Sequence, residues 1–312
     1  MLTERRSPPA TATMRAVRLH APGGPGALAI EEVETPRAQA GEALVRVHAA
    51  AITRDELTWP VDRLPAIPSY ELSGVVAALG PGVEGLAVGD AVYALTPFDR
   101  DGVAAEYTAV PARALALKPS ALSHVESAAV PLAALSAWQG LFDRGGLEGG
   151  ERVLVPGATG GVGHLAVQLA RWRGAYVIGT ASSAGMEAAR GFGAHEVLDR
   201  TRAGWERTIE PVDLIFDTVG GEMMARSGPL VRPGGRIVSV AEPPPPAIDG
   251  IYFVVEPNRE QLIEVARLID AGRLRPAIDS VFPLSEARSA FERVQASGKC
   301  GKVVLEVADE PA

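Results

Sequence analysis

Cysteine is almost absent from this sequence, which contains only Cys300 among its 312 residues. One thiol can form neither an intrachain disulfide nor a metal site of four cysteines, and the five histidines show no spacing typical of metal ligands. We therefore expect no bound metal. Because disulfides are rare in reducing compartments, this cysteine content is also consistent with a cytoplasmic protein, which is what we expect.

Long apolar runs and a basic surplus are missing as well. No stretch approaches the ~18 apolar residues of a membrane-spanning helix. Residues 1–13 lack the apolar segment of a signal peptide, so we expect them to form a disordered extension. The formal net charge is −8, from 38 acidic and 30 basic residues. With no basic stripe, this balance favours a small-molecule ligand over a nucleic acid or a membrane.

The apolar pattern divides the chain into two parts. Up to about residue 118, short apolar runs alternate with Gly- and Pro-rich breakers, which is typical of a compact antiparallel β domain. Later apolar runs at 153–155, 176–178, 214–216 and 237–240 mostly have helical stretches between them. That alternation predicts βαβ units, a parallel sheet and an α/β fold class.

A glycine-rich turn gives the strongest functional signal. The apolar run 153–155 leads into Gly157-Ala158-Thr159-Gly160-Gly161-Val162-Gly163, and an apolar stripe typical of an amphipathic helix follows. Such glycines let the backbone approach a pyrophosphate, whose charge is stabilised by the N–H groups and dipole at the helix start. We expect a dinucleotide at Thr159, Gly160, Gly161 and Val162. The alternative is a tight strand–helix turn without a ligand.

The end of the next strand indicates which dinucleotide binds. An NAD site usually has Asp or Glu about 20 residues after the turn, whereas Gly179-Thr180-Ala181-Ser182-Ser183 contains no acid. Ser182 and Ser183 can donate hydrogen bonds to a 2′-phosphate, and Arg200 can supply a cation. We therefore expect NADPH, with Thr180 and these three residues at its adenosine end. The alternative role for the two serines is helix capping.

Several motifs in the right order resemble the medium-chain dehydrogenase/reductase superfamily, and within it the zinc-independent, quinone oxidoreductase-like branch. The motifs are Met14-Arg15-Ala16-Val17, Gly74-Val75-Val76, Val88-Gly89-Asp90-Ala91-Val92-Tyr93, Ala105-Glu106-Tyr107, Gly160-Gly161-Val162-Gly163, Asp217-Thr218-Val219-Gly220-Gly221, Gly234-Gly235-Arg236-Ile237-Val238 and Gly301-Lys302-Val303-Val304. The resemblance implies a GroES-like β-barrel catalytic domain, residues 14–123 with 256–312, plus a Rossmann doubly wound parallel-sheet cofactor domain, residues 124–255.

The resemblance also implies where the catalytic groups lie. Zinc-dependent relatives have a cysteine where this chain has Thr53 and a Gly-His-Glu where it has Ser69-Tyr70-Glu71, so two metal ligands are replaced by Thr53 and Tyr70. A third ligand, a cysteine near residues 131–132, is also missing. We expect Tyr70, Thr53 and Glu56 to face the nicotinamide. Without a metal to stabilise an alkoxide, alcohol oxidation becomes difficult.

More cofactor contacts are expected at the carboxyl edge of the sheet, where open α/β sheets bind ligands. By resemblance, the ribose and nicotinamide should be flanked by Thr218, Val219, Val240, Ala241, Phe253, Val254 and Val255. For Val240, Phe253 and Val254 the alternative is ordinary sheet core. Relatives commonly dimerise through edge strands, and the apolar run 251–255 could lie near such an edge, so we expect a homodimer.

Two functions remain open at this stage. In the first, NADPH delivers hydride to a quinone or to the activated C=C of an α,β-unsaturated carbonyl compound, and bound water or Tyr70 protonates the product. In the second, the chain binds NADPH as a redox sensor or structural protein, because a fold alone does not fix a function. The enzyme is the favoured interpretation.

Overall fold

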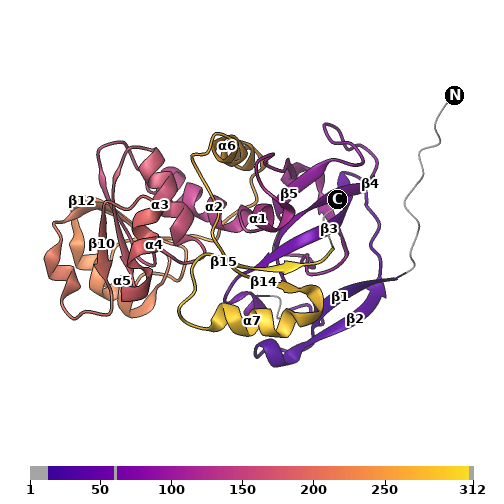
Figure 1. Ribbon diagram of the computed structural model, residues 1–312, viewed down its shortest axis with the longest axis horizontal. Helices are drawn as coiled ribbons and strands as arrows, with labels where there is room; N and C mark the ends of the chain where they lie inside the picture. Colours follow the sequence, from indigo (N-terminus) through magenta and orange to yellow (C-terminus); the bar gives the residue numbers. More distant parts are fainter. Residues whose placement is uncertain (1–12, 60–61, 309–312) are drawn as a thin grey trace.

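The computed structural model describes residues 13–59 and 62–308, which form two lobes (Figure 1). The first and last parts of the chain build a β-barrel lobe, and the middle builds a layered α/β lobe (Figure 1). Thr13 pairs with Glu34, so it belongs to the first strand rather than to the expected extension. The rest of that extension, residues 1–12, lies outside the described residues.

Most strands of the barrel lobe are short and separated by turns, as the breakers in the sequence predict, although β3 spans 11 residues. The central strand β3 pairs antiparallel with β4, with β6 near its start and with β15 near its end. Strand β15, late in the chain, therefore completes a sheet that β3 begins. The strands of this lobe are β1 (Thr13–Leu19), β2 (Leu28–Glu34), β3 (Glu42–Ile52), β4 (Glu71–Leu79), β5 (Ala91–Leu95), β6 (Tyr107–Pro111), β7 (Ala116–Leu117), β14 (Ile278–Pro283) and β15 (Lys302–Glu306).

The α/β lobe contains a parallel sheet in the order β10-β9-β8-β11-β12-β13. Numbered along the chain, the strands have the order 3-2-1-4-5-6, which is the order of a Rossmann sheet. The order in which strands are added to the sheet changes direction between β8 and β11. Ligands bind at such a switch point. The strands are β8 (Arg152–Val155), β9 (Tyr176–Ala181), β10 (Glu196–Asp199), β11 (Val212–Asp217), β12 (Val231–Ser239) and β13 (Ile251–Tyr252).

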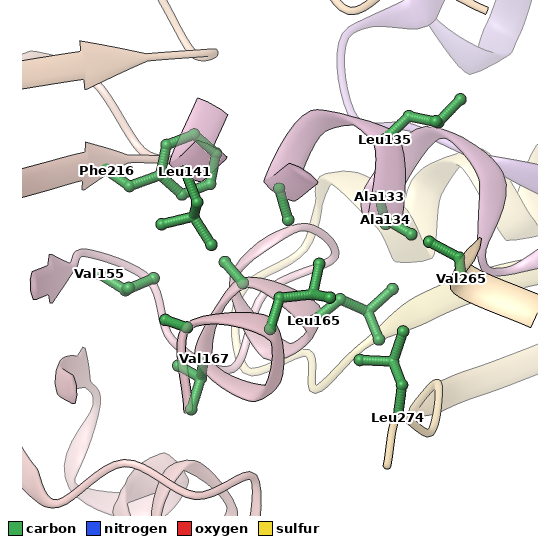
Figure 2. Packing of buried hydrophobic residues seen from close by; sticks show 14 of the residues in the cluster. Ala133, Ala134, Leu135, Leu141, Val155, Leu165, Val167, Phe216, Val265 and Leu274 are labelled. Carbon is green, nitrogen blue, oxygen red and sulfur yellow. The ribbon is translucent and has the colours of Figure 1, made fainter. Parts of the chain in front are cut away.

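Helices connect the strands and link the lobes. They are α1 (His124–Ala128), α2 (Pro131–Trp138), α3 (Gly163–Trp172), α4 (Met186–Gly191), α5 (Gly221–Ser227), α6 (Arg259–Asp270) and α7 (Ala287–Gln295). Leu135 of α2, Leu165 of α3 and Val265 of α6 belong to one buried cluster with Phe216 of β11 (Figure 2). Tyr70 of the barrel lobe belongs to the same cluster. The two lobes therefore share a continuous apolar core.

None of the helices in the described part of the chain combines the length and the apolar character that crossing a bilayer requires. The apolar stripe expected after the glycine-rich turn is present in α3, where Leu165, Ala166 and Leu169 are buried. Trp172, which continues the same helical spacing at the end of α3, is instead 43% exposed and packs against Trp138 and Phe142. Helical spacing alone could not distinguish this aromatic contact at the surface from burial in the core.

Candidate active site

The glycine-rich turn is closed tightly against its surroundings. Gly157 has φ +72°, and a Cβ there would lie 2.7 Å from Val219 Cγ2 and 3.0 Å from Thr218 Oγ1. A Cβ on Gly163, at the start of α3, would lie 2.1 Å from the Gly157 carbonyl oxygen. Side chains at these positions would force the turn apart. The predicted Thr218 and Val219 are thus brought directly against the turn that follows β8.

Hydrogen bonds hold the neighbouring strand ends together. The Thr218 hydroxyl donates to the Pro156 carbonyl oxygen at 2.7 Å, which joins the end of β11 to the end of β8. Asp217 is fully buried and accepts from the Ser239 hydroxyl at 2.8 Å and from the Gly220 N–H at 3.1 Å. The sequence pattern did not predict Asp217 as a site residue. An acid directly after the apolar run 214–216 is the signal that could have identified it.

The next strand contributes to the expected adenosine end. Thr180 is buried, and its Oγ1 accepts a hydrogen bond from the Gly157 N–H at 3.2 Å. The Arg200 N–H donates to the Ala181 carbonyl oxygen at 2.9 Å, and the Arg200 side chain is exposed. The backbone of Arg200 therefore lies beside Ala181, the residue that precedes Ser182. Ser182 precedes a short 3-10 turn without capping it through its side chain.

Asp199 brings a carboxylate to this region from β10, although β9 itself ends without one. The Ser183 and Thr201 hydroxyls each donate to Asp199 at 2.6 Å. These hydrogen bonds, that of Ser183 first, lower the pKa of Asp199 to about 2. Ser183 is thus already engaged and does not cap a helix. The NADPH expectation rests on the absence of an acid. The end of β9 has none, but the neighbouring strand β10 ends in one.

The other residues expected to contact the cofactor differ in how exposed their side chains are. The Val240 N–H donates to the Asp217 carbonyl oxygen at 3.1 Å, which holds half-buried Val240 and exposed Ala241 at the carboxyl edge of the sheet.

Beyond β13, Phe253 and Val255 are 7% and 8% exposed and join the core, whereas Val254 is 58% exposed. The core alternative therefore describes Phe253 but not Val254.

On the barrel side, Glu56 joins two of the segments expected to be catalytic. Its carboxylate is buried and accepts from the Thr53 N–H at 2.9 Å and from the Ser69 N–H at 3.1 Å. Burial raises the pKa of Glu56 to about 8, against the opposing effect of those two donors. Glu56 therefore holds Thr53 and the segment before Tyr70 together.

Tyr70 is fully buried in an aromatic cluster. Its ring centroid lies 5.8 Å from that of Trp59 and 5.1 Å from that of Phe98. Its hydroxyl oxygen accepts from the Arg63 guanidinium at 3.0 Å, and Arg63 also donates to the Phe98 carbonyl oxygen. Burial raises the pKa of the Tyr70 phenol. Arg63, a partner that the sequence analysis did not identify, thus holds the phenol in place.

Lys302 links the glycine-rich turn to the barrel. A Cβ on Gly161 would lie 3.2 Å from Lys302 Cδ, so the lysine stem passes close to the turn. Its ammonium forms an ion pair with Glu71 and donates to Thr53 Oγ1 at 3.1 Å. Both members of the ion pair are buried, at 4% exposure for Lys302 and 1% for Glu71. Lys302 lies in one of the motifs that carry the family resemblance, but no role for this side chain was predicted from the sequence.

Comparisons with known proteins cover both lobes. The alcohol dehydrogenase GroES-like domain family matches residues 39–120, and the zinc-binding dehydrogenase family matches residues 192–305. The 2-methylene-furan-3-one reductase of Solanum lycopersicum is 34% identical over 88% of this chain and 74% of its own length. The chloroplastic NADPH-dependent alkenal/one oxidoreductase of Arabidopsis thaliana is 33% identical over 91% of this chain and 77% of its own.

Solved structures show the same relationship. The quinone oxidoreductase of Coxiella burnetii superposes with a TM-score of 0.89 at 29% identity, covering 95% of this chain and all of that one. The two lobes, the strand order 3-2-1-4-5-6 and the glycine-rich turn at the switch point agree with these matches. A GroES-like barrel is thus combined with a Rossmann unit, and the chain belongs to the medium-chain dehydrogenase/reductase family.

Proposed function

We propose that this protein is an NADPH-dependent oxidoreductase that reduces a quinone or the activated C=C of an α,β-unsaturated carbonyl compound without a metal. The observation that carries the proposal is the direct approach of the glycine-rich turn to Lys302, whose ammonium contacts Thr53 and Glu71 in the barrel. Relatives named as a furanone reductase, an alkenal/one oxidoreductase and a quinone oxidoreductase support this chemistry over a sensor without catalysis.

The residues around the turn fit a dinucleotide. Gly160 and Gly161 carry no side chain that would keep a pyrophosphate from the backbone, and free N–H groups at a helix start such as that of α3 stabilise its charge. We assign Ser182 and Arg200 to the 2′-phosphate, because both lie where β9 ends. When bound, the nicotinamide supplies hydride. Thr218, Val219, Val240 and Ala241 line the same edge of the sheet and would flank it.

The donor set at the expected metal position explains why we propose catalysis without zinc. Zinc sites in proteins use thiolate, imidazole or carboxylate ligands. Thr53 offers a hydroxyl that accepts from Lys302, and Tyr70 offers a phenol that accepts from Arg63. Neither group is a usual zinc ligand, so hydride transfer to an acceptor with a polarised double bond is the reaction that remains accessible.

Steady-state turnover tests the proposal. Purified protein is mixed with NADPH and a panel of quinones, enals and enones, and oxidation is followed by the loss of nicotinamide absorbance. We expect oxidation with at least one acceptor class and no NADP⁺ reduction by simple alcohols. Tight NADPH binding without turnover on any acceptor would contradict the proposal and would favour the sensor.

We further infer a homodimer in a reducing, cytoplasmic compartment. The dimer is supported by β13 at the edge of the parallel sheet, where Ile251 is 45% exposed and Tyr252 41%. Apolar side chains on an open strand edge favour pairing with another strand. The compartment is supported by the lone thiol, Cys300, which is half-buried.

A further inference from the structure

The position of the Lys302 ammonium is fixed from two directions. Upstream, the Gly301 N–H donates to the Thr159 carbonyl oxygen and the Lys302 N–H donates to that of Ala277, both at 2.9 Å. At the far end, the ammonium meets Glu71, whose second oxygen accepts from the Leu132 N–H at 2.9 Å. A charge held at both ends loses little further freedom when a ligand arrives, which is the condition for electrostatic preorganisation.

The donor and acceptor roles of Lys302 and Thr53 determine where the hydroxyl hydrogen of Thr53 points. A lysine ammonium can only donate, so Thr53 Oγ1 accepts the 3.1 Å hydrogen bond. The hydroxyl hydrogen of Thr53 must therefore point away from Lys302. Because Thr53 is only half-buried, whereas Lys302 is buried, the hydroxyl can present that hydrogen to a ligand at the surface.

We propose that Lys302 is a positioning residue that acts through Thr53, so that the Thr53 hydroxyl donates a hydrogen bond to the carbonyl oxygen of the bound acceptor. This inference rests on the proposed reductase function. Lys302 polarises the Thr53 hydroxyl and makes it a stronger donor. Glu71 keeps the buried ammonium paired.

The electron balance of the reaction shows why this oxygen needs a donor. Hydride adds to the β-carbon, the C=C electron pair moves toward the carbonyl carbon, and the carbonyl oxygen becomes a negatively charged enolate oxygen. A proton from water then reaches the α-carbon and gives the saturated ketone. A hydrogen bond to the oxygen stabilises the charge as it develops. For a quinone, the oxygen that gains charge becomes a hydroxyl of the hydroquinone.

The other nearby groups are less suited to this role. The Tyr70 phenol is fully buried and held by Arg63. The Glu56 carboxylate is turned toward two backbone N–H groups. Of the three residues expected to be catalytic, Thr53 is the one that is partly exposed. Its hydroxyl oxygen accepts from a buried cation, Lys302.

Binding of an oxyanion analogue tests the inference without turnover. The phenolate form of para-nitrophenol mimics the enolate oxygen, and its absorbance reports the bound ionisation state. We expect wild type and Thr53→Ser to bind the phenolate about tenfold or more tightly than the phenol, and Thr53→Val to lose that preference. An unchanged phenolate preference in Thr53→Val would overturn the inference, even if the protein proved to have no reductase activity.

A kinetic cycle tests the role of Lys302. Lys302→Met combined with Glu71→Gln removes both members of the buried pair, so that neither charge is left unpaired. We expect this double variant and Thr53→Val each to lower kcat on an enone about tenfold or more, and their combination to lose about as much as either alone. The Kd for NADPH, measured by fluorescence, should stay within about twofold.

Thr53→Ser keeps the hydroxyl and should restore most of the turnover. Fully additive losses would mean that Lys302 does not act through Thr53, and that result would also overturn the inference. If wild type and Thr53→Val turned over enones equally well, the inference would be refuted and the reductase function would still stand.

Discussion

The backbone N–H of Gly301 donates a hydrogen bond to the carbonyl oxygen of Thr159, with an N···O distance of 2.9 Å. This contact attaches the start of β15 to the turn that would hold the cofactor pyrophosphate. Gly301 has φ +85°, and a Cβ there would lie 2.0 Å from the Ala277 carbonyl oxygen, so only glycine fits. The glycine-rich turn and the position of Lys302 in the barrel are therefore mechanically connected.

Substitutions of Ser69 should show how much its backbone conformation lowers the stability of the fold. It has φ 68°, a region that favours glycine, and its hydroxyl donates to the Ala51 carbonyl oxygen at 2.8 Å. Ser69→Ala loses the hydrogen bond and keeps the strain, so we expect a loss of about 1–3 kcal/mol in the free energy of unfolding. Ser69→Gly loses the same bond but relieves the strain, and should be about 1 kcal/mol more stable than Ser69→Ala. Urea denaturation measures both, and equal stabilities would contradict the strain.

His164 should make stability depend on pH. Burial lowers its pKa to about 4, with the Lys302 charge acting in the same direction, and its Nδ1 contacts the Gly160 carbonyl oxygen at 2.9 Å. Since an unfolded histidine titrates near about 6.5, the unfolded state binds more protons between those values. The contribution of His164 to stability should therefore fall as pH drops from about 6.5 toward 4, and level off below.

A matched variant isolates that contribution. His164→Gln cannot titrate in this range, so the stability difference between wild type and variant should narrow by up to about 1.4 kcal/mol per pH unit as the pH falls. Chemical denaturation at a series of pH values gives the comparison. Parallel stability curves would contradict the lowered pKa of His164, because they would mean that this residue binds protons equally in the folded and unfolded states.

Ser182→Asp should change cofactor preference. A carboxylate at the end of β9 repels a 2′-phosphate and can accept from ribose hydroxyls, so we expect the NADPH affinity to fall about tenfold or more while NADH binding is retained or improved. Arg200→Met should weaken NADPH binding without affecting NADH. Arg190→Met, an exposed charge change on α4, is the control. Fluorescence titration measures each Kd, and a wild type that binds both cofactors equally would contradict the assignment.

Tyr70→Phe separates packing from proton donation. The phenol is buried and accepts from Arg63, so we expect kcat to remain within about threefold of wild type, with a stability loss of about 1 kcal/mol from the lost hydrogen bond. Steady-state kinetics and thermal unfolding measure the two effects. A fall in kcat of about tenfold or more, with NADPH affinity retained, would instead identify Tyr70 as the proton donor.

Edge-strand pairing should be sensitive to charge on β13. Tyr252→Lys introduces a cation at an apolar edge, and we expect it to shift the protein from dimer to monomer at micromolar concentration. Val281→Lys makes the same change on β14, the edge of the barrel sheet, where Val281 is 42% exposed. Sedimentation velocity should show dissociation in the first variant alone. A monomeric wild type would remove the dimer altogether.

Local sequence patterns predicted the parts of the structure that depend on local chemistry. The strands before and after the glycine-rich turn, the turn itself and α3 lie where spacing and glycine placement put them. The contacts of Tyr70 with Arg63 and of Thr53 with Lys302 could not be obtained in this way. They join side chains through tertiary packing, and Thr53 lies 249 positions from Lys302. Resemblance located Thr53 and Tyr70, but their hydrogen-bond partners required the fold.

The pairing of β3 with β15 has a consequence for synthesis on the ribosome. The partners Ile52 and Val303 are separated by most of the chain, which at roughly 5–20 residues per second takes on the order of 10 to 50 s to translate. During that time residues 49–52 have left the ribosomal exit tunnel, but the strand edge that will pair with β15 has no partner. The Rossmann strands, whose partners are nearer in sequence, can assemble first. Until β15 is made, this edge of the nascent barrel is free to pair with strands of other chains.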